Sequence, residues 1–221
     1  MYTILPTEAF KAICPTFAGA AIYAEVSNSA TQPELWAEIT HYTDMLRENY
    51  TPDTIKHRSG IAATRAAYKA AGKDPSRYRP ACEQLARRVL QGKELYSVDT
   101  LVDLVNLASL FSGYSTAALD AEKIAGNCIE LDFGREGEPY EGIGRGALNI
   151  ENLPVYRDEE GAFATPTSDS TRTMLSPDTH LLLVLINGYD GDQQNLEDTI
   201  NLTIDLLQRY ADCTAYQVIN Y

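Results

Sequence analysis

The sequence has few residues that could bind a metal ion. The three histidines are His41, His57 and His180, and the four cysteines are Cys14, Cys82, Cys128 and Cys213. The cysteines are widely scattered and no pair of them has the spacing of metal ligands, so we expect neither a metal site nor a cofactor. Scattered cysteines without an export signal are typical of reduced, mostly buried thiols, and they indicate a cytoplasmic protein.

Long apolar runs and a leader segment are also missing. No run of about 18 apolar residues is present, so we expect no membrane-spanning helix and no membrane partner. The N-terminal stretch "MYTILPTEAFKAIC" lacks the basic region followed by an apolar segment that marks a signal peptide. The chain has 221 residues, 44% hydrophobic and 22% charged, which is typical of a globular protein with a core of its own.

Positive charge is scarce overall but concentrated in one segment. The chain has 18 basic and 31 acidic residues, a net charge of −13, which by itself argues against a nucleic-acid partner. Between residues 56 and 93, however, ten basic residues face only two acidic ones, which leaves +8 in this segment and −21 elsewhere. The ten are Lys56, Arg58, Arg65, Lys69, Lys73, Arg77, Arg79, Arg87, Arg88 and Lys93. The segment is either a pair of solvated amphipathic helices or a phosphate-binding face, with Arg77, Arg79, Arg87 and Arg88 as candidate RNA contacts.

Hydrophobic periodicity predicts an α+β fold. Helices are expected over residues 31–50, 60–72, 80–92, 97–113 and 195–210. Strands are expected over 17–28, in the stretches "NCIELDF", "PYEGIG", "LPVYRD", "AFATPT" and "HLLLVLIN", and in the final "TAYQVINY". A helical N-terminal half, a mainly β centre and a closing helix and strand indicate helices around a mixed sheet, not a regular alternation of the two.

The helix expected over 97–113 carries a strip of polar residues on an otherwise apolar surface. Eight residues between Leu101 and Phe111 are apolar, so the helix should be central, flanked by strands from the 128–187 region. Asp103, Asn106 and Ser109 recur every three residues, which places them on one narrow strip. Buried polar groups need partners, so the strip faces either neighbouring loops or a ligand pocket.

The stretch "FATPTSDSTRTML", residues 163–175, holds six hydroxyl side chains around Asp169 and Arg172. Turn chemistry braced by an Asp169–Arg172 ion pair would explain it, and so would a pocket for a polar ligand. For a pocket, the candidate catalytic residues are Asp169, Ser170 and Asn106, and the candidate substrate-binding residues are Thr167, Ser168, Arg172 and Asp103. We expect Asn106, Asp169, Ser170 and Arg172 to converge on one cleft.

The glycine-rich stretch "YEGIGRGALNIEN", residues 140–152, matches neither the dinucleotide fingerprint nor the P-loop. We interpret it as a flexible loop that brings Glu141 and Arg145 to the edge of a pocket, as further substrate-binding candidates.

Two long blocks resemble a known domain. They are "DPSRYRPACEQLARRVLQGKELYSVDTLVDLVNLASLFSGYSTAALDAEKI" and "GEPYEGIGRGALNIENLPVYRDEEGAFATPTSDSTRTM". The chain is similar to a freestanding B3/B4 domain from about His57 to Ile186. This domain is otherwise embedded in the β subunit of bacterial phenylalanyl-tRNA synthetase, where it removes a wrongly attached amino acid from tRNA. The strongest marks are "VDLVNL", the segment 113–124 and "PTSDSTRT".

The resemblance implies a B3/B4-like fold and roles for particular residues. The helix with Asp103 and Asn106 resembles the "VDITN" helix that flanks the editing pocket. "SGYSTAALDAEKI" resembles "GQPLHAFDLDKI", whose histidine contributes to editing, and here the matching position is Ala117. The loop over 165–172 resembles the one that supplies a pocket glutamate, and its nearest acid is Asp169. Asp120 and Lys123 match scaffold positions.

The resemblance also implies one domain over 1–221. In this division, residues 1–55 are an N-terminal extension packed on the domain, and 56–93 are a basic helical segment. Residues 97–187 are the pocket-bearing core, and 195–221 are a closing helix and strand.

Three functions remain open at this point. The chain is a hydrolase that deacylates mischarged aminoacyl-tRNA in trans, a non-catalytic module that binds tRNA or another RNA, or a binder of a free amino acid or related small molecule. The basic segment favours the first two, whereas the net acidity and Ala117 count against the first. Asp169 could pair with the ammonium group or orient a water, and an activated ester needs little more than that and a donor to the oxyanion. Ser170 as a nucleophile would need a base close by in space. A ligase is not expected, because the chain lacks a synthetase core.

Overall fold

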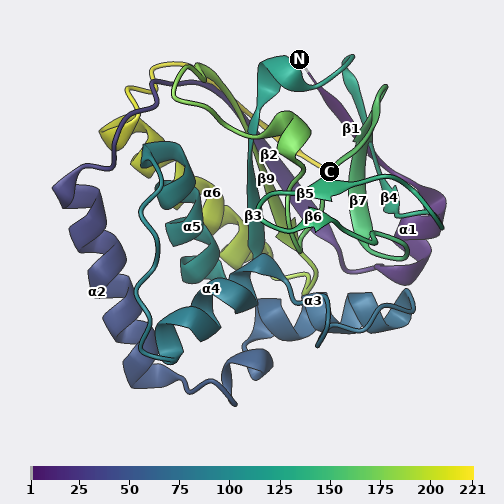
Figure 1. The fold of residues 1–221 in the computed structure, drawn as a ribbon, viewed down its shortest axis with the longest axis horizontal. Coiled ribbons are helices and arrows are strands. Elements are labelled where there is room, and N and C mark those ends of the chain that lie inside the picture. The colour runs from purple at the N-terminus through teal and green to yellow at the C-terminus, as the bar shows by residue number, and fades with distance from the viewer. Residues whose placement is uncertain (1) are drawn as a thin grey trace.

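Two four-stranded β-sheets and six α-helices make up most of residues 2–221, which are the residues that the computed structural model describes (Figure 1). The first sheet has the order β1 (Thr3–Pro6), β4 (Cys128–Phe133), β7 (Pro154–Asp158), β8 (Gly161–Ala164). The second has the order β10 (Tyr216–Asn220), β2 (Ala18–Glu25), β9 (Leu181–Gly188), β3 (Ser115–Asp120). The pair β1–β4 is parallel and the other pairs in these sheets are antiparallel. A small hairpin joins β5 (Glu141–Gly142) to β6 (Gly146–Ala147).

The helices follow the predicted periodicity closely. They are α1 (Glu8–Ile13), α2 (Pro33–Asn49), α3 (Ser59–Ala70), α4 (Ala81–Leu90), α5 (Thr100–Ser112) and α6 (Gln193–Tyr210). All five predicted helices are present with ends within a few residues, and only the short α1 was not expected. The chain is therefore an α+β protein. Within residues 2–221, no helix combines the length and the apolar character needed to cross a membrane.

The strand β9 is buried on both faces, which explains its continuous apolar sequence. Leu183 and Leu185 pack against the first sheet, in a cluster with Leu131 and Phe163. The alternate residues, such as Val184, pack against α5 and α6 in a second cluster. Because side chains alternate across a strand, one run of apolar residues serves both layers. The molecule thus stacks the first sheet, the second sheet and the helices α2, α5 and α6 in that order, while α1 and α3 pack with residues of the first sheet.

The N-terminal region is part of these layers, and its description as an extension was wrong. β1 pairs with β4, and β2 lies inside the second sheet between β10 and β9. β1 was not expected because its four residues are too short to show a clear period.

Helix α5 is buried, but its surroundings differ from the expectation. Leu104 is fully buried and Leu107 is 4% exposed. The helix contacts α6, α2, α4 and β3, so helices cover most of it, and β9 is the part of the 128–187 region that shares its apolar cluster. It begins at Asp99, whose carboxylate accepts a hydrogen bond from the Val102 N–H (2.8 Å), and ends at Gly113 in the left-handed conformation.

Truncating Leu104 to alanine should lower the free energy of unfolding by about 2–5 kcal/mol, because it leaves a cavity where four elements meet. The matched control is Leu5→Ala on β1, where the side chain is 51% exposed, and its effect should stay within about 0.5 kcal/mol. Urea denaturation of the two variants checks this. Equal effects would mean that α5 is not part of the core.

Candidate functional site

The hydroxyl-rich loop between β8 and β9 owes much of its composition to its own turns. The Thr165 hydroxyl accepts hydrogen bonds from the N–H groups of Thr167 and Ser168, both at 3.1 Å. The Ser170 hydroxyl accepts from the N–H of Arg172 (3.2 Å) and caps a short 3₁₀ turn. Thr167 is buried and its hydroxyl shares a hydrogen bond with that of Tyr68 (2.9 Å). Thr165, Thr167 and Ser170 therefore hold the loop in shape.

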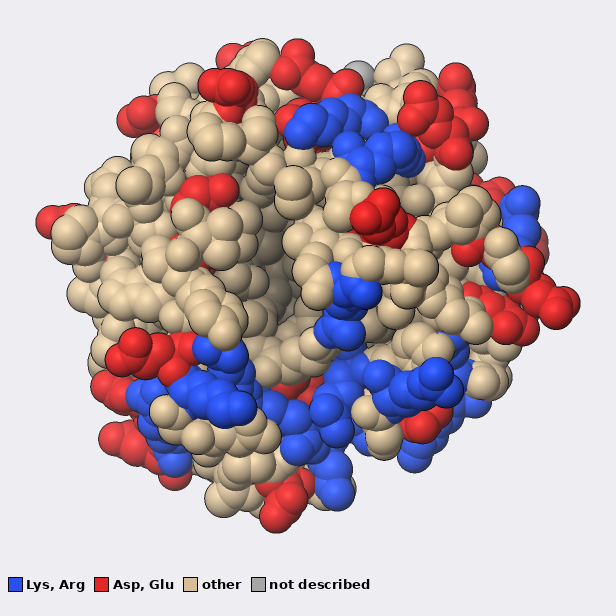
Figure 2. All heavy atoms as spheres, viewed as in Figure 1, with Lys and Arg blue, Asp and Glu red and all other residues tan. Residues whose placement is uncertain are grey.

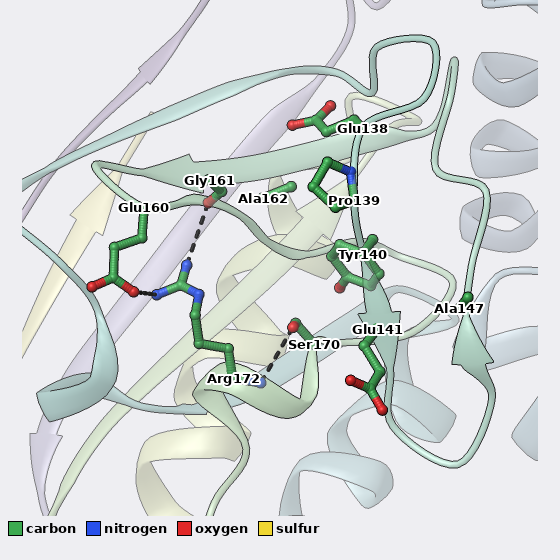
Figure 3. Close-up of a pocket in the computed structure, with 10 residues that line it drawn as sticks. All are labelled: Glu138, Pro139, Tyr140, Glu141, Ala147, Glu160, Gly161, Ala162, Ser170 and Arg172. Atoms are coloured by element: carbon green, nitrogen blue, oxygen red, sulfur yellow. Dashed lines mark hydrogen bonds and ion pairs between the residues drawn. The ribbon is translucent and has the colours of Figure 1, made fainter.

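Arg172 does not pair with Asp169, so the ion pair that turn chemistry predicted between these two residues is wrong. Its guanidinium binds both carboxylate oxygens of Asp158, at 2.8 and 3.0 Å, and reaches Glu160 at 3.3 Å (Figure 3). Asp158 lies at the end of β7 and its side chain is fully buried. The bidentate pair ties the loop to the β7–β8 hairpin.

An open groove of about 790 Å³ lies on one side of this loop. Its lining residues are Glu138, Pro139, Tyr140, Glu141, Ala147, Glu160, Gly161, Ala162, Ser170 and Arg172 (Figure 3). Two of its acids are already engaged, because Glu138 pairs with Arg157 (2.6 Å) and Glu160 with Arg172. The groove is therefore wide but offers few free charged groups.

A second, enclosed cavity of about 30 Å³ lies on the other side of the loop, between the two sheets and α4. It is lined by Ala81, Ser115, Thr116, Ala117, Tyr156, Ala164, Thr165, Pro166, Ser168, Asp169 and Asn187. This volume has room for about one water molecule, and the lining supplies the polar partners that a water needs. Asp169 faces this cavity, whereas Ser170 and Arg172 face the groove.

The carboxyl group of Asp169 is held by backbone groups from both sheets. The backbone groups of Ala118, on β3, and of Thr165, directly after β8, interact with it and favour its charged form. β3 is an edge strand, which leaves its backbone at Ala118 free to reach across. Burial outweighs these two interactions and raises the pKa of Asp169 to about 8. An acid that titrates near neutral pH can give or accept a proton under physiological conditions.

A tyrosine and an asparagine form the polar wall opposite Asp169. The Tyr156 hydroxyl donates to Oδ1 of Asn187 (2.6 Å) and shares a hydrogen bond with the Tyr221 hydroxyl (2.9 Å). The Asn187 amide in turn donates to the Ser115 carbonyl (2.8 Å). Sequence reasoning missed both residues. The one available signal was a polar Asn187 at the end of the run "HLLLVLIN".

Of the polar strip of α5, Ser109 alone comes near this site, where its hydroxyl accepts a hydrogen bond from the N–H of the cavity-lining Thr116 (3.2 Å). Asp103 is buried and accepts hydrogen bonds from the Thr31 hydroxyl (2.6 Å), the Ser97 hydroxyl (2.8 Å) and the Val98 N–H (3.2 Å). Asp103 therefore anchors the segment before α5 and is not available to a substrate. Asn106 is half-buried and lines neither the cavity nor the groove. The expected convergence of Asn106, Asp169, Ser170 and Arg172 is not observed.

The β5–β6 hairpin docks on the Asp169 loop and reaches over to α4. The Ile143 N–H donates to the Asp169 carbonyl (2.9 Å), and the Tyr140 hydroxyl donates to the Ser168 carbonyl (2.7 Å). At the tip, Arg145 contacts the side-chain oxygen of Gln84 on α4. Arg145 therefore links the hairpin to α4, while Glu141 lines the open groove. The molecule is hollowed near the centre of this face, between the helices and the β-rich part (Figure 2).

The basic segment divides into structural and exposed residues. Arg65 and Arg87 both pair with the fully buried Glu83, at 2.8 and 2.7 Å, so Arg87 does not belong among the RNA contacts. Lys73 and Arg58 donate to backbone carbonyls, which satisfies helix and loop ends. The exposed members are Lys56, Lys69, Arg77, Arg79 and Lys93, and Arg88 is half-buried. Lys and Arg side chains gather along the lower edge of this face, around α3 and α4 (Figure 2).

The Asp169 cavity predicts a pH-dependent stability. With the pKa of Asp169 raised to about 8, the folded state binds more protons than the unfolded state between about pH 4 and pH 8, so stability falls as pH rises through this window. Asp169→Asn removes this titration. The melting temperature of the wild type should be compared with that of the variant at pH 5 and at pH 8.5. Between these two pH values the wild type should lose about 3 °C or more relative to the variant. A loss of ~1 kcal/mol in the free energy of unfolding produces such a change in a domain of this size. If the melting temperatures of the wild type and the variant change with pH in the same way, Asp169 is in contact with bulk water.

A comparison with curated proteins found no match. A family of known domains, the B3/4 domain, matches residues 63–212, which is more than half of the 221-residue chain. The match includes α4, α5, β3, the β5–β6 hairpin and the Asp169 loop, and thus every residue that lines the enclosed cavity. The chain therefore belongs to the B3/4 domain family, the family of the tRNA-binding and editing module.

Proposed function

We propose that this protein binds the acceptor end of aminoacyl-tRNA and hydrolyses the ester of a mischarged one at the Asp169 cavity. One observation carries the proposal. Ala117 matches the histidine position of the synthetase editing pocket, Asp169 is the nearest acid in the loop that resembles the one supplying the glutamate, and here both line one small polar cavity. They lie 52 positions apart in the sequence, so their meeting is not a consequence of local structure.

The chemistry asked of Asp169 is modest. Its carboxylate accepts a proton from a water while the water oxygen adds to the ester carbonyl carbon. The bond from that carbon to the ribose oxygen then breaks, and the proton passes to the ribose oxygen, which leaves a free amino acid and uncharged tRNA. The Ser168 hydroxyl lines the same cavity and is a candidate donor to the developing oxyanion, whereas the Thr116 hydroxyl donates to the Val105 carbonyl (2.9 Å). A cavity of about 30 Å³ suits the water, so the ester approaches from outside, beside Arg145 and Gln84.

The charge distribution supports RNA as the partner. Among the ion pairs of residues 2–221, none involves Arg77, Arg79, Arg88 or Arg145, although acidic residues far outnumber basic ones. Three of these arginines contact neutral groups instead: Arg77 the Tyr78 ring, Arg88 the Tyr96 ring and Arg145 the Gln84 amide. Cations without carboxylate partners on one face are available to phosphates.

A binding module without hydrolysis is the second candidate, and Ala117 favours it. The methyl group of alanine can neither transfer a proton nor orient a water, so the histidine's contribution has no replacement at this position. The experiment on Asp169 below separates the two.

Incubation with a panel of tRNAs, each charged with a labelled amino acid, should release the amino acid from at least one. Asp169→Asn should reduce the rate at least about 100-fold, the usual contribution of a general base, while tRNA affinity stays within about twofold. Because the pKa of Asp169 is raised to about 8, the wild-type rate, after subtraction of the spontaneous rate, should rise with pH and level off above that value.

The matched control is Asp178→Asn, which changes an exposed aspartate outside the cavity and should leave the rate unchanged. If the protein retains tRNA but releases no amino acid, the proposed hydrolysis is wrong and the protein is a binding module.

Binding of tRNA should weaken steeply as salt rises, because neutralised phosphates release counterions. The triple change of Arg77, Arg79 and Arg88 to alanine should reduce the slope of log K against log salt by up to about 3. An equally charged control replaces Lys11, Arg47 and Arg135, all exposed and outside the basic segment, and should leave the slope unchanged. An equal decrease of the slope in both triple variants would mean that the basic segment contributes only through its charge and is not a specific binding face.

A further inference from the structure

We infer that Tyr96, backed by Arg88, is a stacking platform for an unpaired nucleobase that lies a few nucleotides before the aminoacylated end. This inference rests on the proposed function and identifies the part of the RNA that the protein reads. It is carried by the exposure of the ring, the way the fold holds it, and its position along α4.

The Tyr96 ring is 71% exposed, in the connection between α4 and α5. The guanidinium carbon of Arg88 lies 3.9 Å from the ring centroid, which places the cation against one face. The Arg88 Nε donates to the Glu94 carbonyl (2.6 Å), which fixes the orientation of the guanidinium. The ring therefore has a cation on one side and remains largely open to a second flat group, the arrangement that stacks a base.

The exposure of Tyr96 is imposed by its neighbours on both sides. Leu95 before it packs into the apolar clusters around α2 and α4. After it, the Ser97 hydroxyl and the Val98 N–H donate to the buried carboxyl of Asp103. The chain is thus anchored immediately before and after Tyr96, and the ring is presented outward by the fold. This also gives the polar strip of α5 an indirect role, since Asp103 positions the platform.

A line along α4 joins the platform to the cavity. Ala81 lines the cavity, Gln84 contacts Arg145, and Arg88 stacks on Tyr96. These positions are separated by three and four residues, so they lie on the same face of the helix. From the first to the last, the helix rises about 10 Å, which equals about three stacked nucleotides at ~3.4 Å each.

This spacing fits an acceptor end whose last nucleotides are unpaired. With the aminoacylated nucleotide at the cavity, a base two or three positions earlier reaches Tyr96. The exposed Lys93 and the half-buried Arg88 supply positive charge at that point, which suits a phosphate backbone better than an apolar protein partner.

The test compares two uncharged minihelix RNAs of the same sequence, one with a short unpaired 3′ end and one blunt-ended. The wild type should bind the tailed RNA more tightly than the blunt one. Tyr96→Ala should weaken binding of the tailed RNA about tenfold, the effect expected for losing one stacked base, and leave blunt RNA and the salt slope unchanged. Tyr96→Phe keeps the ring and should bind as the wild type does.

Tyr216→Ala is the matched control, since this tyrosine is 43% exposed on the edge strand β10, and it should change neither affinity. Wild-type affinity of Tyr96→Ala for the tailed RNA would overturn this inference and leave the proposed function standing. So would an equal loss on both RNAs, because it would place Tyr96 away from the unpaired end. If the wild type binds neither RNA, the proposed function itself fails and this inference with it.

Discussion

A polar contact at Asp169 joins the two sheets beside their apolar interface. Asp169 follows the first sheet, yet one of the backbone groups that favour its charged form is that of Ala118, at the free edge of the second sheet. No cation compensates the group, so burial keeps it mainly protonated near neutral pH. A conventional core would place an apolar residue here at less cost, because an acid buried without a counter-charge is destabilising. The small cavity lies at this junction, and the β5–β6 hairpin docks on the same loop through the Asp169 carbonyl.

Polar residues that look functional in the sequence divide, in the structure, into those that hold the fold and those that remain available. Asp103 and Glu83 are buried and fully engaged, and Arg172 is tied to Asp158. What remains available is a small set around α4: the Asp169 carboxyl in the cavity, Arg145 on the β5–β6 hairpin, and the arginines without carboxylate partners along the basic face. Although the protein is acidic, the arginines of the basic face are therefore not neutralised by carboxylates of the same protein.

The sequence is sufficient to predict elements whose period is long and consistent. The helices and the doubly buried β9 were predicted for this reason, whereas β1 and α1, with four and six residues, were not. Pairings across the fold were not predictable. Arg172 stands three residues from Asp169 but pairs with Asp158, because the β7–β8 hairpin brings that acid alongside. Tyr156 and Asn187 meet in the cavity from different sheets, a contact set by strand register. Asp169 was found from the hydroxyl-rich stretch and Ala117 through family resemblance, and the structure places both on one cavity.

The central claim is that Asp169 is a partly buried acid, with a raised pKa, in the cavity where an aminoacyl ester is hydrolysed. The most direct measurement is the ¹³C NMR signal of the Asp169 carboxyl, followed as pH is varied, with and without an adenosine that carries its amino acid through a non-hydrolysable amide. The account predicts that this carboxyl titrates near pH 8 in the free protein and that both its shift and its titration change when the analogue binds. A carboxyl that titrates near pH 4 and does not respond to the analogue would contradict it.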